Sequence, residues 1–490
     1  MARSLFDAIV SILFGKVGVM VISAVFTPIL VRMLGPSQYG QYATILSIFA
    51  LVNVILTSGT NDAIRKFISE RDDQKWRNDI FGSVGRLAIL LWIIVAVGFL
   101  IGINSGVVES AFGSEYVPLF YLLIFYALGR QSREFLLRTL MGLQKELYTE
   151  PTRVLQKTTF AVLALFAAYH GYQVPGILAA DIITSALISL ILLIIISKEV
   201  DLRSLFRSSD TTLQKSSVYT YTVNTMIFVG CTTSLIHIDV LILRFNEPEN
   251  VVGYYRGALV IAQTLWAGSF AIQLALLQRV SGLWEDNDIS GIQERASQAS
   301  RYAVLFTLLV IIGMAVLAHD FVPLYLGSGF QPAVLPLLLL LPGVLGFAIA
   351  RPILAINQAQ RSLRPLIAAA AGSAVLNIIL NLLLIPIFGM TGAAIATSLS
   401  YFSLVMTQSV AARKLGYKPF QGIRLSRIFL IGIITTIPLF VLSRVIQSPV
   451  LSIIVVAPVG FCLFSGLAIQ ADLVPSEDLE QLELKLQAWR

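Results

Sequence analysis

Long apolar runs separated by short polar segments organise this chain from one end to the other. Runs of about 18 or more apolar residues recur along its whole length. The alternating apolar and polar pattern that indicates β-strands does not compete with them. In lipid, every backbone N–H and C=O group has to be paired within the chain, so runs of this length must be helices. The pattern therefore predicts an all-α polytopic membrane protein.

The apolar runs predict about fourteen transmembrane helices. Their expected ranges are 6–33, 40–64, 82–102, 117–142, 154–170, 174–196, 217–244, 252–280, 302–320, 331–356, 365–385, 389–412, 427–445 and 449–470. The first run is too long for the core of a signal peptide and lacks a convincing cleavage site, so we expect it to be retained.

Basic residues between the predicted helices lie on one side of the membrane only. If the N-terminus is cytoplasmic, Lys or Arg occurs in every inner segment, namely 1–5, 65–81, 143–153, 197–216, 281–301, 357–364, 413–426 and 471–490. The intervening outer loops contain none. Because short loops rich in Lys and Arg stay inside, both termini are predicted to be cytoplasmic, in a multi-pass protein of the cell membrane.

Composition agrees with this interpretation. The chain of 490 residues is 56% hydrophobic and 13% charged, with a mean hydropathy of +0.81, whereas soluble domains average about 25% charged residues. The net charge of +7 follows from the inner loops and suits anionic lipid, so no nucleic-acid partner is expected. Cys231 and Cys462 both lie in apolar runs and predict neither a disulfide framework nor a metal site. No catalytic motif, metal or cofactor is expected, and the acidic segment 285–288 is interpreted as a solvated loop.

The chain also contains an internal repeat. The segment "LGPSQYGQYA" at 34–43 has a counterpart in "NEPENVVGYY" at 246–255. Further matches are "FGSEYVP" at 112–118 with "LGSGFQP" at 326–332, and "GILAAD" at 176–181 with "GAAIAT" at 392–397. Offsets that increase from 212 to 216 indicate a duplication with small insertions.

The duplication predicts the domain organisation. A six-helix bundle at 1–212 is followed by its repeat at 213–424, and the last two helices occupy 425–490. An even number of helices per repeat gives both halves the same orientation, as in transporters whose substrate site lies between two bundles that rock. The segment 34–43 is then an outer hairpin, in which Gly and Pro supply turn geometry. A gating role for the two hairpins is the alternative.

Several predicted helices carry charged residues in spite of a cost of about 2.5–3.5 kcal/mol per charge at the bilayer centre. In the fourth helix, Arg130, Glu134 and Arg138 share one face. The others are Lys16 in the first helix, Arg133 beside the arginines of the fourth, Arg351 in the tenth, His237 and Asp239 in the seventh, Asp62 in the second and Asp181 in the sixth.

Two interpretations of these charges remain open. Lys16, Arg130, Arg133, Arg138 and Arg351 could line a hydrated cavity for an anionic head group, because Arg binds phosphate bidentately. Alternatively, Arg130, Glu134 and Arg138 form an ion-pair ladder that only holds helices together.

The acidic residues and the histidine have open roles as well. Asp62, Asp181, Asp239 and His237 are candidates for ion coupling or gating. Pairing with a nearby cation is an equal alternative for Asp239, and packing or hydrogen bonding is the alternative for His237.

At "VRMLGPSQYGQYA" (31–43) and "DVLILRFNEPENVVGYY" (239–255), the chain resembles the Wzx-like O-antigen and polysaccharide flippases. These proteins belong to the superfamily that contains the MATE multidrug exporters, and the resemblance covers essentially the whole chain. It implies translocation of a polyprenyl-phosphate- or pyrophosphate-linked oligosaccharide from the cytoplasmic to the outer leaflet, for polysaccharide or glycoprotein glycan assembly. Membrane lipids and glycan assembly proteins are the further partners that it implies, and the last two helices would help to accommodate the lipid tail.

The alternative functions predict different sequence features. A multidrug or cation antiporter of the same superfamily would favour a carboxylate-rich cavity, whereas the charged helix positions here are rich in Arg. A membrane glycan polymerase or ligase would be expected to have a large outer loop with catalytic residues, but the longest predicted outer loop, 103–116, has 14 residues. A membrane scaffold without transport activity would leave the charged helices unexplained.

The predicted orientation can be tested with single cysteines. After Cys231 and Cys462 are replaced by Ser, Ser114→Cys should react with a membrane-impermeant maleimide in intact cells. Ser209→Cys should react only after permeabilisation, because positive-inside topology places it in the cytoplasm. Labelling of Ser209→Cys in intact cells would reverse the orientation.

Overall fold

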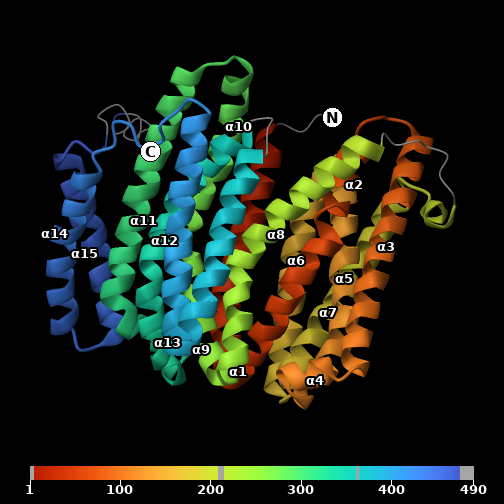
Figure 1. Ribbon diagram of the computed structural model, residues 1–490, viewed down its shortest axis with the longest axis horizontal. Coiled ribbons are helices and arrows are strands. Elements are labelled where there is room, and N and C mark those ends of the chain that lie inside the picture. The colour runs from red at the N-terminus through yellow and green to blue at the C-terminus, as the bar shows by residue number, and fades with distance from the viewer. Residues whose placement is uncertain (1–4, 208–214, 360–363, 475–479, 481–490) are drawn as a thin grey trace. The chain divides into compact units, whose positions relative to one another are not determined.

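The computed structural model describes residues 5–207, 215–359, 364–474 and 480, and in these residues it is helical without any strand. The elements along the chain are α1 (Leu5–Thr57), α2 (Thr60–Ile68), α3 (Gln74–Asn104), α4 (Val107–Phe112), η1 (Ser114–Tyr116), α5 (Val117–Gly142), α6 (Glu146–Tyr169), α7 (Gln173–Ile196), η2 (Leu202–Phe206), α8 (Lys215–Asn246), α9 (Glu249–Thr264), α10 (Ala267–Glu285), α11 (Ile289–Leu326), η3 (Ser328–Ala333), α12 (Val334–Ala359), α13 (Arg364–Lys414), α14 (Leu425–Val445) and α15 (Pro449–Gln470). Figure 1 shows their course. The predicted all-α fold is confirmed.

Two long helices are each interrupted at a single glycine. In α1 the break is at Gly35 (φ 69°, ψ 174°), and in α13 it is at Gly389 (φ 54°, ψ −132°). With these breaks, helix is present at each of the fourteen ranges expected from the sequence. The predicted loop at 34–39 is reduced to one residue, since Pro36 is compatible with the first turn of a helix and the helix resumes there.

Nine helices in the described part of the chain are long and apolar enough to cross a membrane, or ten if the bent pair α9 and α10 forms one span. Such a set establishes a multi-pass membrane protein, while the count of fourteen crossings stays a prediction. α5 and α6 have 26 and 24 residues but are not among the nine, because each carries four charged residues.

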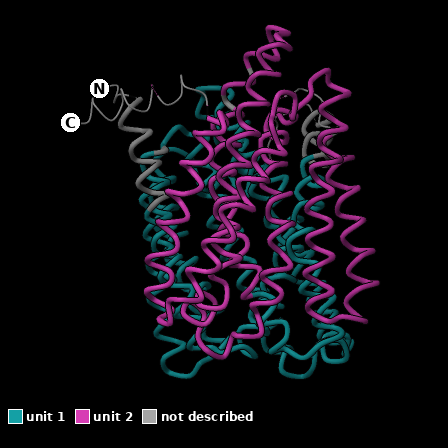
Figure 2. The backbone as a smooth tube through the Cα atoms, turned by 90° about the vertical axis from the view of Figure 1, so that its left-hand side faces the viewer, with its two compact units in different colours: residues 1–256 teal, residues 257–490 magenta. Residues whose placement is uncertain are grey.

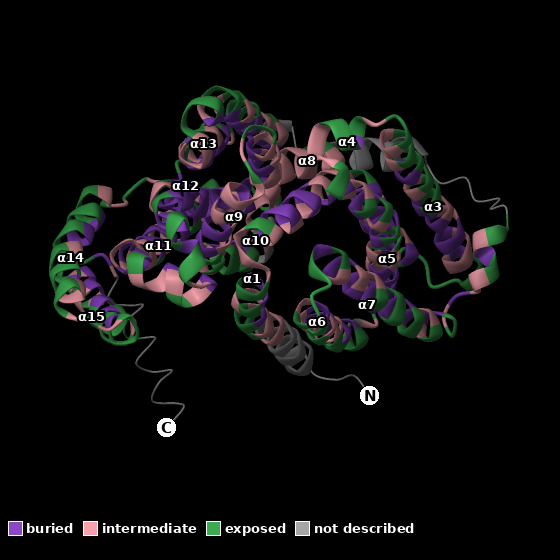
Figure 3. Ribbon diagram, turned by 90° about the horizontal axis from the view of Figure 1, so that it is seen from below, coloured by how far each residue is buried: buried purple, intermediate pink, exposed green. Residues whose placement is uncertain are grey.

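The chain divides into two compact units, residues 1–256 and 257–490 (Figure 2). In the first unit α5 packs against α7, α2 and α3, and α1 packs against α6 and α8. In the second unit α12 is enclosed by α10, α11 and α13, while α14 and α15 lie side by side against α11 (Figure 1). Buried residues lie mostly on the helix faces that meet neighbours (Figure 3). The predicted repeat boundaries at 212 and 424 stay predictions.

Equivalent positions of the repeat have equivalent backbone geometry. Gly113 has φ 106° and ψ 159°, and Gly327, 214 positions later, has φ 105° and ψ 156°. Glycine is the residue that tolerates this conformation. Each of the two glycines is followed at once by a 3₁₀ helix, η1 or η3. This correspondence supports the duplication that the sequence predicts.

The first segment of the repeat and its counterpart meet through glycines inside the first unit. A Cβ atom on Gly40 would lie 1.8 Å from the backbone oxygen of Glu249, and one on Gly253 would lie 1.9 Å from that of Pro36. Ser37 also donates a hydrogen bond to Glu249 (Oγ to Oε2, 3.3 Å). The contact between α1 and α9 is therefore reciprocal and runs backbone to backbone, which only glycine permits.

Gly40→Ala should destabilise the protein, because its methyl group would overlap the main chain of α9. An overpacked contact of this kind costs about 1–3 kcal/mol, measurable as a lower melting temperature of the purified protein. Gly98→Ala is the control, since its Cβ atom would meet nothing within 4 Å. The control should melt at the same temperature or slightly higher, and equal melting of the two variants would contradict this account of Gly40.

Candidate functional site

Two arginines of α5 share one carboxylate of α7 in the first unit. Arg130 Nη1 lies 3.1 Å from Asp181 Oδ2, and Arg133 Nη1 lies 3.3 Å from Asp181 Oδ1. The side chains of Arg133 and Asp181 are 2% and 5% exposed, whereas that of Arg130 is 36% exposed. Asp181 thus compensates a buried charge and, at the same time, holds a second guanidinium that remains accessible.

Hydroxyl groups and rings complete this cluster. Ser185 Oγ accepts from Arg133 Nη1 (2.7 Å) and donates to Asp181 Oδ1 (3.0 Å). Arg130 donates to Tyr126 OH (3.2 Å) and lies 5.6 Å from the centroid of the Phe49 ring. In a medium of low dielectric constant, an ion pair is stable when further hydrogen bonds of this kind occupy its remaining donors and acceptors.

The ladder considered for Arg130, Glu134 and Arg138 is not what the structure contains. Among the described residues, the carboxylate of Glu134 comes within ion-pair distance of Arg133 alone, at 3.8 Å. Spacing of i and i+4 places the three side chains on one face, but Asp181 approaches from a different helix and pairs with two of the arginines. Arg138 is partly buried and its Nε atom has no hydrogen-bond partner.

The polar residues of α8 are held by hydrogen bonds within the first unit. Asp239 is fully buried and accepts hydrogen bonds from Tyr255 OH and from the Val240 backbone N–H. His237 Nδ1 lies 3.3 Å from Ser47 Oγ, with the donor set by the tautomer of the ring. Both residues keep the coupling or gating role as a prediction.

Two other predicted residues stand apart from these contacts. Asp62 lies in the first turn of α2, partly buried, and has no ion-pair partner in the described part of the chain. Lys16 falls outside the residues whose side chains the structure describes.

Arg351 of α12 has an environment unlike that of the arginines in α5. Its Nη1 atom donates to Gln273 Oε1 (3.0 Å) on α10. The guanidinium carbon lies 4.3 Å from the ring centroid of Phe347, 5.3 Å from that of Phe270 and 5.8 Å from that of Trp266. No described carboxylate lies within ion-pair distance of it. Sequence reasoning found Arg351 but missed these neighbours.

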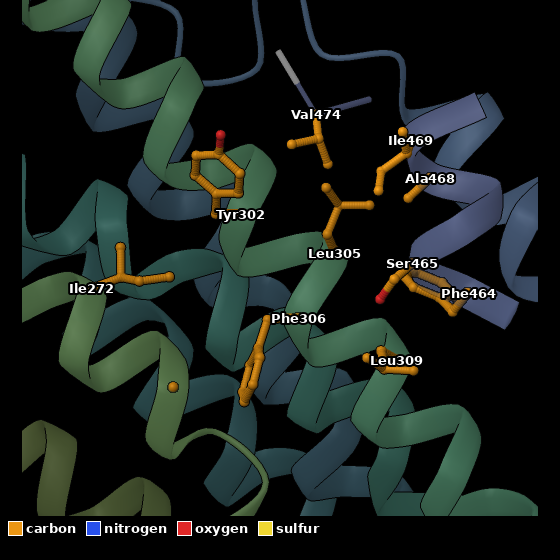
Figure 4. Close-up of a pocket in the computed structure, with 11 residues that line it drawn as sticks. Ile272, Tyr302, Leu305, Phe306, Leu309, Phe464, Ser465, Ala468, Ile469 and Val474 are labelled. Carbon is orange, nitrogen blue, oxygen red and sulfur yellow. The ribbon is translucent and has the colours of Figure 1, made fainter. Parts of the chain in front are cut away.

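An apolar pocket of about 450 Å³ lies between α10, α11 and α15 in the second unit. In Figure 4, Leu305 and Leu309 of α11 point toward Ile469 and Phe464 of α15. Ile272 of α10 and Phe306 of α11 line the pocket as well. It therefore involves α15, which lies outside the predicted repeat. Within the described residues, no cluster of His, Cys, Asp or Glu side chains could hold a metal ion.

A model of the family described as "Polysaccharide biosynthesis protein" matches residues 5–276 of this chain. The chain belongs to that family. A second model, of the lipid II flippase MurJ, matches residues 158–457. The resemblance to polysaccharide flippases is thereby confirmed, as is the expectation that the protein is a transporter and not an enzyme.

Similar proteins and structures agree with this assignment. An uncharacterized membrane protein of Methanocaldococcus jannaschii is 24% identical over 463 residues, which cover 87% of each chain. The probable low-salt glycan biosynthesis flippase Agl15 of Haloferax volcanii is 29% identical over 167 residues, covering 33% of this chain and 34% of Agl15.

Solved structures share the fold at low identity. An inward closed lipid II flippase MurJ superposes with a TM-score of 0.76 at 14% identity, covering 96% of this chain and all of the other. An inward-facing multidrug resistance MATE transporter gives a TM-score of 0.66 at 15% identity, over 83% and 98% of the two chains.

Asp181→Asn should destabilise the protein strongly, because it leaves the buried Arg133 without a counter-charge. Removal of one partner from a buried ion pair typically costs about 3–5 kcal/mol, and thermal unfolding of the purified protein measures the loss. Asp62→Asn is the matched control and should unfold like the wild type. If Asp181→Asn unfolds at the same temperature as this control, the pairing described here does not stabilise the fold.

Proposed function

We propose that this protein translocates a lipid-linked oligosaccharide from the cytoplasmic to the outer leaflet of the membrane, for polysaccharide or glycoprotein glycan assembly. The cargo is a glycan joined through phosphate or pyrophosphate to a polyprenyl lipid. Such a molecule combines an anionic, hydrated head group with a long apolar tail. The protein has to accommodate both during transport.

The observation that carries this proposal is the surplus of arginine over carboxylate in the helices. Arg130 and Arg133 share one Asp, and neither Arg138 nor Arg351 has an ion-pair partner among the described residues. Arginine binds phosphate bidentately. Moving one bare charge into a medium of dielectric constant about 4 costs on the order of 20 kcal/mol. A hydrated cavity with accessible arginines such as Arg130 at its wall would remove most of that cost.

The apolar pocket beside α15 suits the other end of the cargo. Its walls are mostly Leu, Ile, Phe, Ala and Val side chains. Burial of a polyprenyl chain against them would contribute about 25 cal/mol per Å² of apolar surface removed from water. The tail would rest there while the head group crosses. Transport would then follow the alternating access expected of two parallel bundles, which rock about a site between them.

The membrane potential is sufficient to drive the proposed cycle outward. Each elementary charge that crosses is worth about 2.3 kcal/mol per 100 mV. A diphosphate with about two negative charges would gain roughly 4–5 kcal/mol when it leaves an inside-negative cell. The emptied cationic cavity would be drawn back toward the inside, so the return step is favoured as well. Exchange against Na⁺ or H⁺ is then not obligatory.

Proteoliposomes test this proposal directly. A labelled lipid-linked sugar should appear in the outer leaflet when valinomycin and K⁺ impose an inside-negative potential, without any Na⁺ or H⁺ gradient. Arg130→Ala should slow this movement by about tenfold or more, because a charge-assisted phosphate contact is lost. Liposomes without protein provide the baseline.

Two results would count against the proposal. If flipping requires an ion gradient at fixed potential, the energetic part is wrong and Asp62, Asp181 or Asp239 becomes the coupling carboxylate. If the protein exports organic cations and does not move the lipid-linked sugar at all, it is a multidrug antiporter.

A further inference from the structure

No carboxylate in the described part of the chain balances the charge of Arg351 at ion-pair distance. Its hydrogen bond to Gln273 uses one of its five N–H donors, and its Nε atom is buried without a partner. Gln273 is itself 7% exposed, so it can hold the guanidinium in place but cannot neutralise it. Within a membrane protein, an uncompensated charge of this kind usually marks a functional site.

The residue one turn before Arg351 in α12 is the aromatic Phe347. In α5, Glu134 stands at the same spacing of four residues before Arg138. One turn before the arginine, α5 therefore has a carboxylate and α12 has a ring. The guanidinium lies 4.3 Å from the centroid of that ring. A cation–π contact stabilises the charge but leaves its hydrogen-bonding capacity for a ligand.

The rings around Arg351 form a cluster and not a single contact. Trp266 and Phe347 have centroids 4.2 Å apart, and Phe347 and Tyr401 have centroids 4.7 Å apart. Phe270 is 45% exposed. An aromatic face carries negative charge density, so it attracts the polarised C–H groups on the apolar face of a pyranose ring.

The helical period separates this cluster from the apolar pocket. At 100° per residue, Trp266, Phe270 and Gln273 share one face of the first turns of α10. Gly268 and Ile272, which line the pocket, lie on the opposite face. One side of α10 therefore presents the aromatic and amide groups that contact Arg351 of α12, and the other side forms a wall of the apolar pocket.

We infer that Arg351, Trp266, Phe270 and Phe347 form a recognition subsite for the phosphate and the first sugar of the cargo. The guanidinium binds the phosphate oxygens and an adjacent ring stacks on the sugar. This inference rests on the proposed function and adds to it the residues that would select a sugar-bearing lipid over a bare polyprenyl diphosphate.

The test uses the full-length protein in nanodiscs and two probes: farnesyl diphosphate, and farnesyl diphosphate carrying one N-acetylhexosamine. Calorimetry measures the Kd of each. Arg351→Gln should weaken the binding of both probes by about tenfold or more, and Arg351→Lys should recover it only in part. Phe270→Leu should reduce the preference for the sugar-bearing probe by about threefold to tenfold, because Phe270 is 45% exposed and its ring can stack on the sugar.

Arg444→Gln is the matched control, because the guanidinium of Arg444 also lies over a ring, 5.1 Å from the Phe440 centroid, but far along the chain in α14. It should bind both probes like the wild type. Equal affinities for Arg351→Gln and Arg444→Gln, in a wild type that flips lipid-linked sugar, would overturn the subsite and leave the proposed function intact. A wild type that neither binds the probes nor flips the sugar would refute both.

Discussion

A charged side chain in a membrane helix has to be compensated inside the protein, and this constraint shapes both units. In the first unit a buried carboxylate performs the task, since Asp181 serves Arg130 and Arg133 at once. In the second unit, the side-chain amide of Gln273 and three aromatic rings surround the guanidinium of Arg351. The two solutions leave different residual chemistry: in the first, two arginines share one carboxylate, and in the second an arginine without an ion-pair partner among the described residues is surrounded by an amide and aromatic rings.

Much of the fold could be read from the sequence because the bilayer leaves few options. Apolar runs of sufficient length must be helices, and Gly35 and Gly113 stand where the backbone needs positive φ. The spacing rules were less informative about ion pairs. The i and i+4 relation of Arg130 and Glu134 holds along one helix, whereas the partner that the arginines use comes from α7, some fifty positions later in the chain.

The surroundings of Arg351 were beyond sequence reasoning for a similar reason. Phe347 is a neighbour along α12, but Trp266 and Gln273 come from α10, and only packing brings them to the guanidinium. Hydropathy also treats Trp266 and Phe270 as ordinary lipid-facing residues. The break before α10 is what distinguishes them, because it sets the first turn of that helix at an angle of 46° to α9.

The amphiphilic nature of the proposed cargo has a counterpart in the construction of α10. A helix with opposite properties on its two faces can separate a hydrated head group from its own tail without any enclosed channel large enough for the whole molecule. The lipid portion of the proposed cargo would then stay in an apolar environment throughout, and polyprenyl chains of different lengths could be transported. Selectivity would then depend on the chemistry near the phosphate and little on the number of isoprene units.

The glycine contact between α1 and α9 has a mechanical consequence. Two main chains that touch directly at Gly40 and Gly253 have no rotamers between them to absorb a displacement. Such a contact would act as a rigid pivot between the two helices. A helix of about 20 residues extends about 30 Å from it, so a tilt of about 10° at the pivot would displace the far end by roughly 5 Å. A small change in helix tilt at one membrane surface would therefore produce a larger displacement of the helix end at the other.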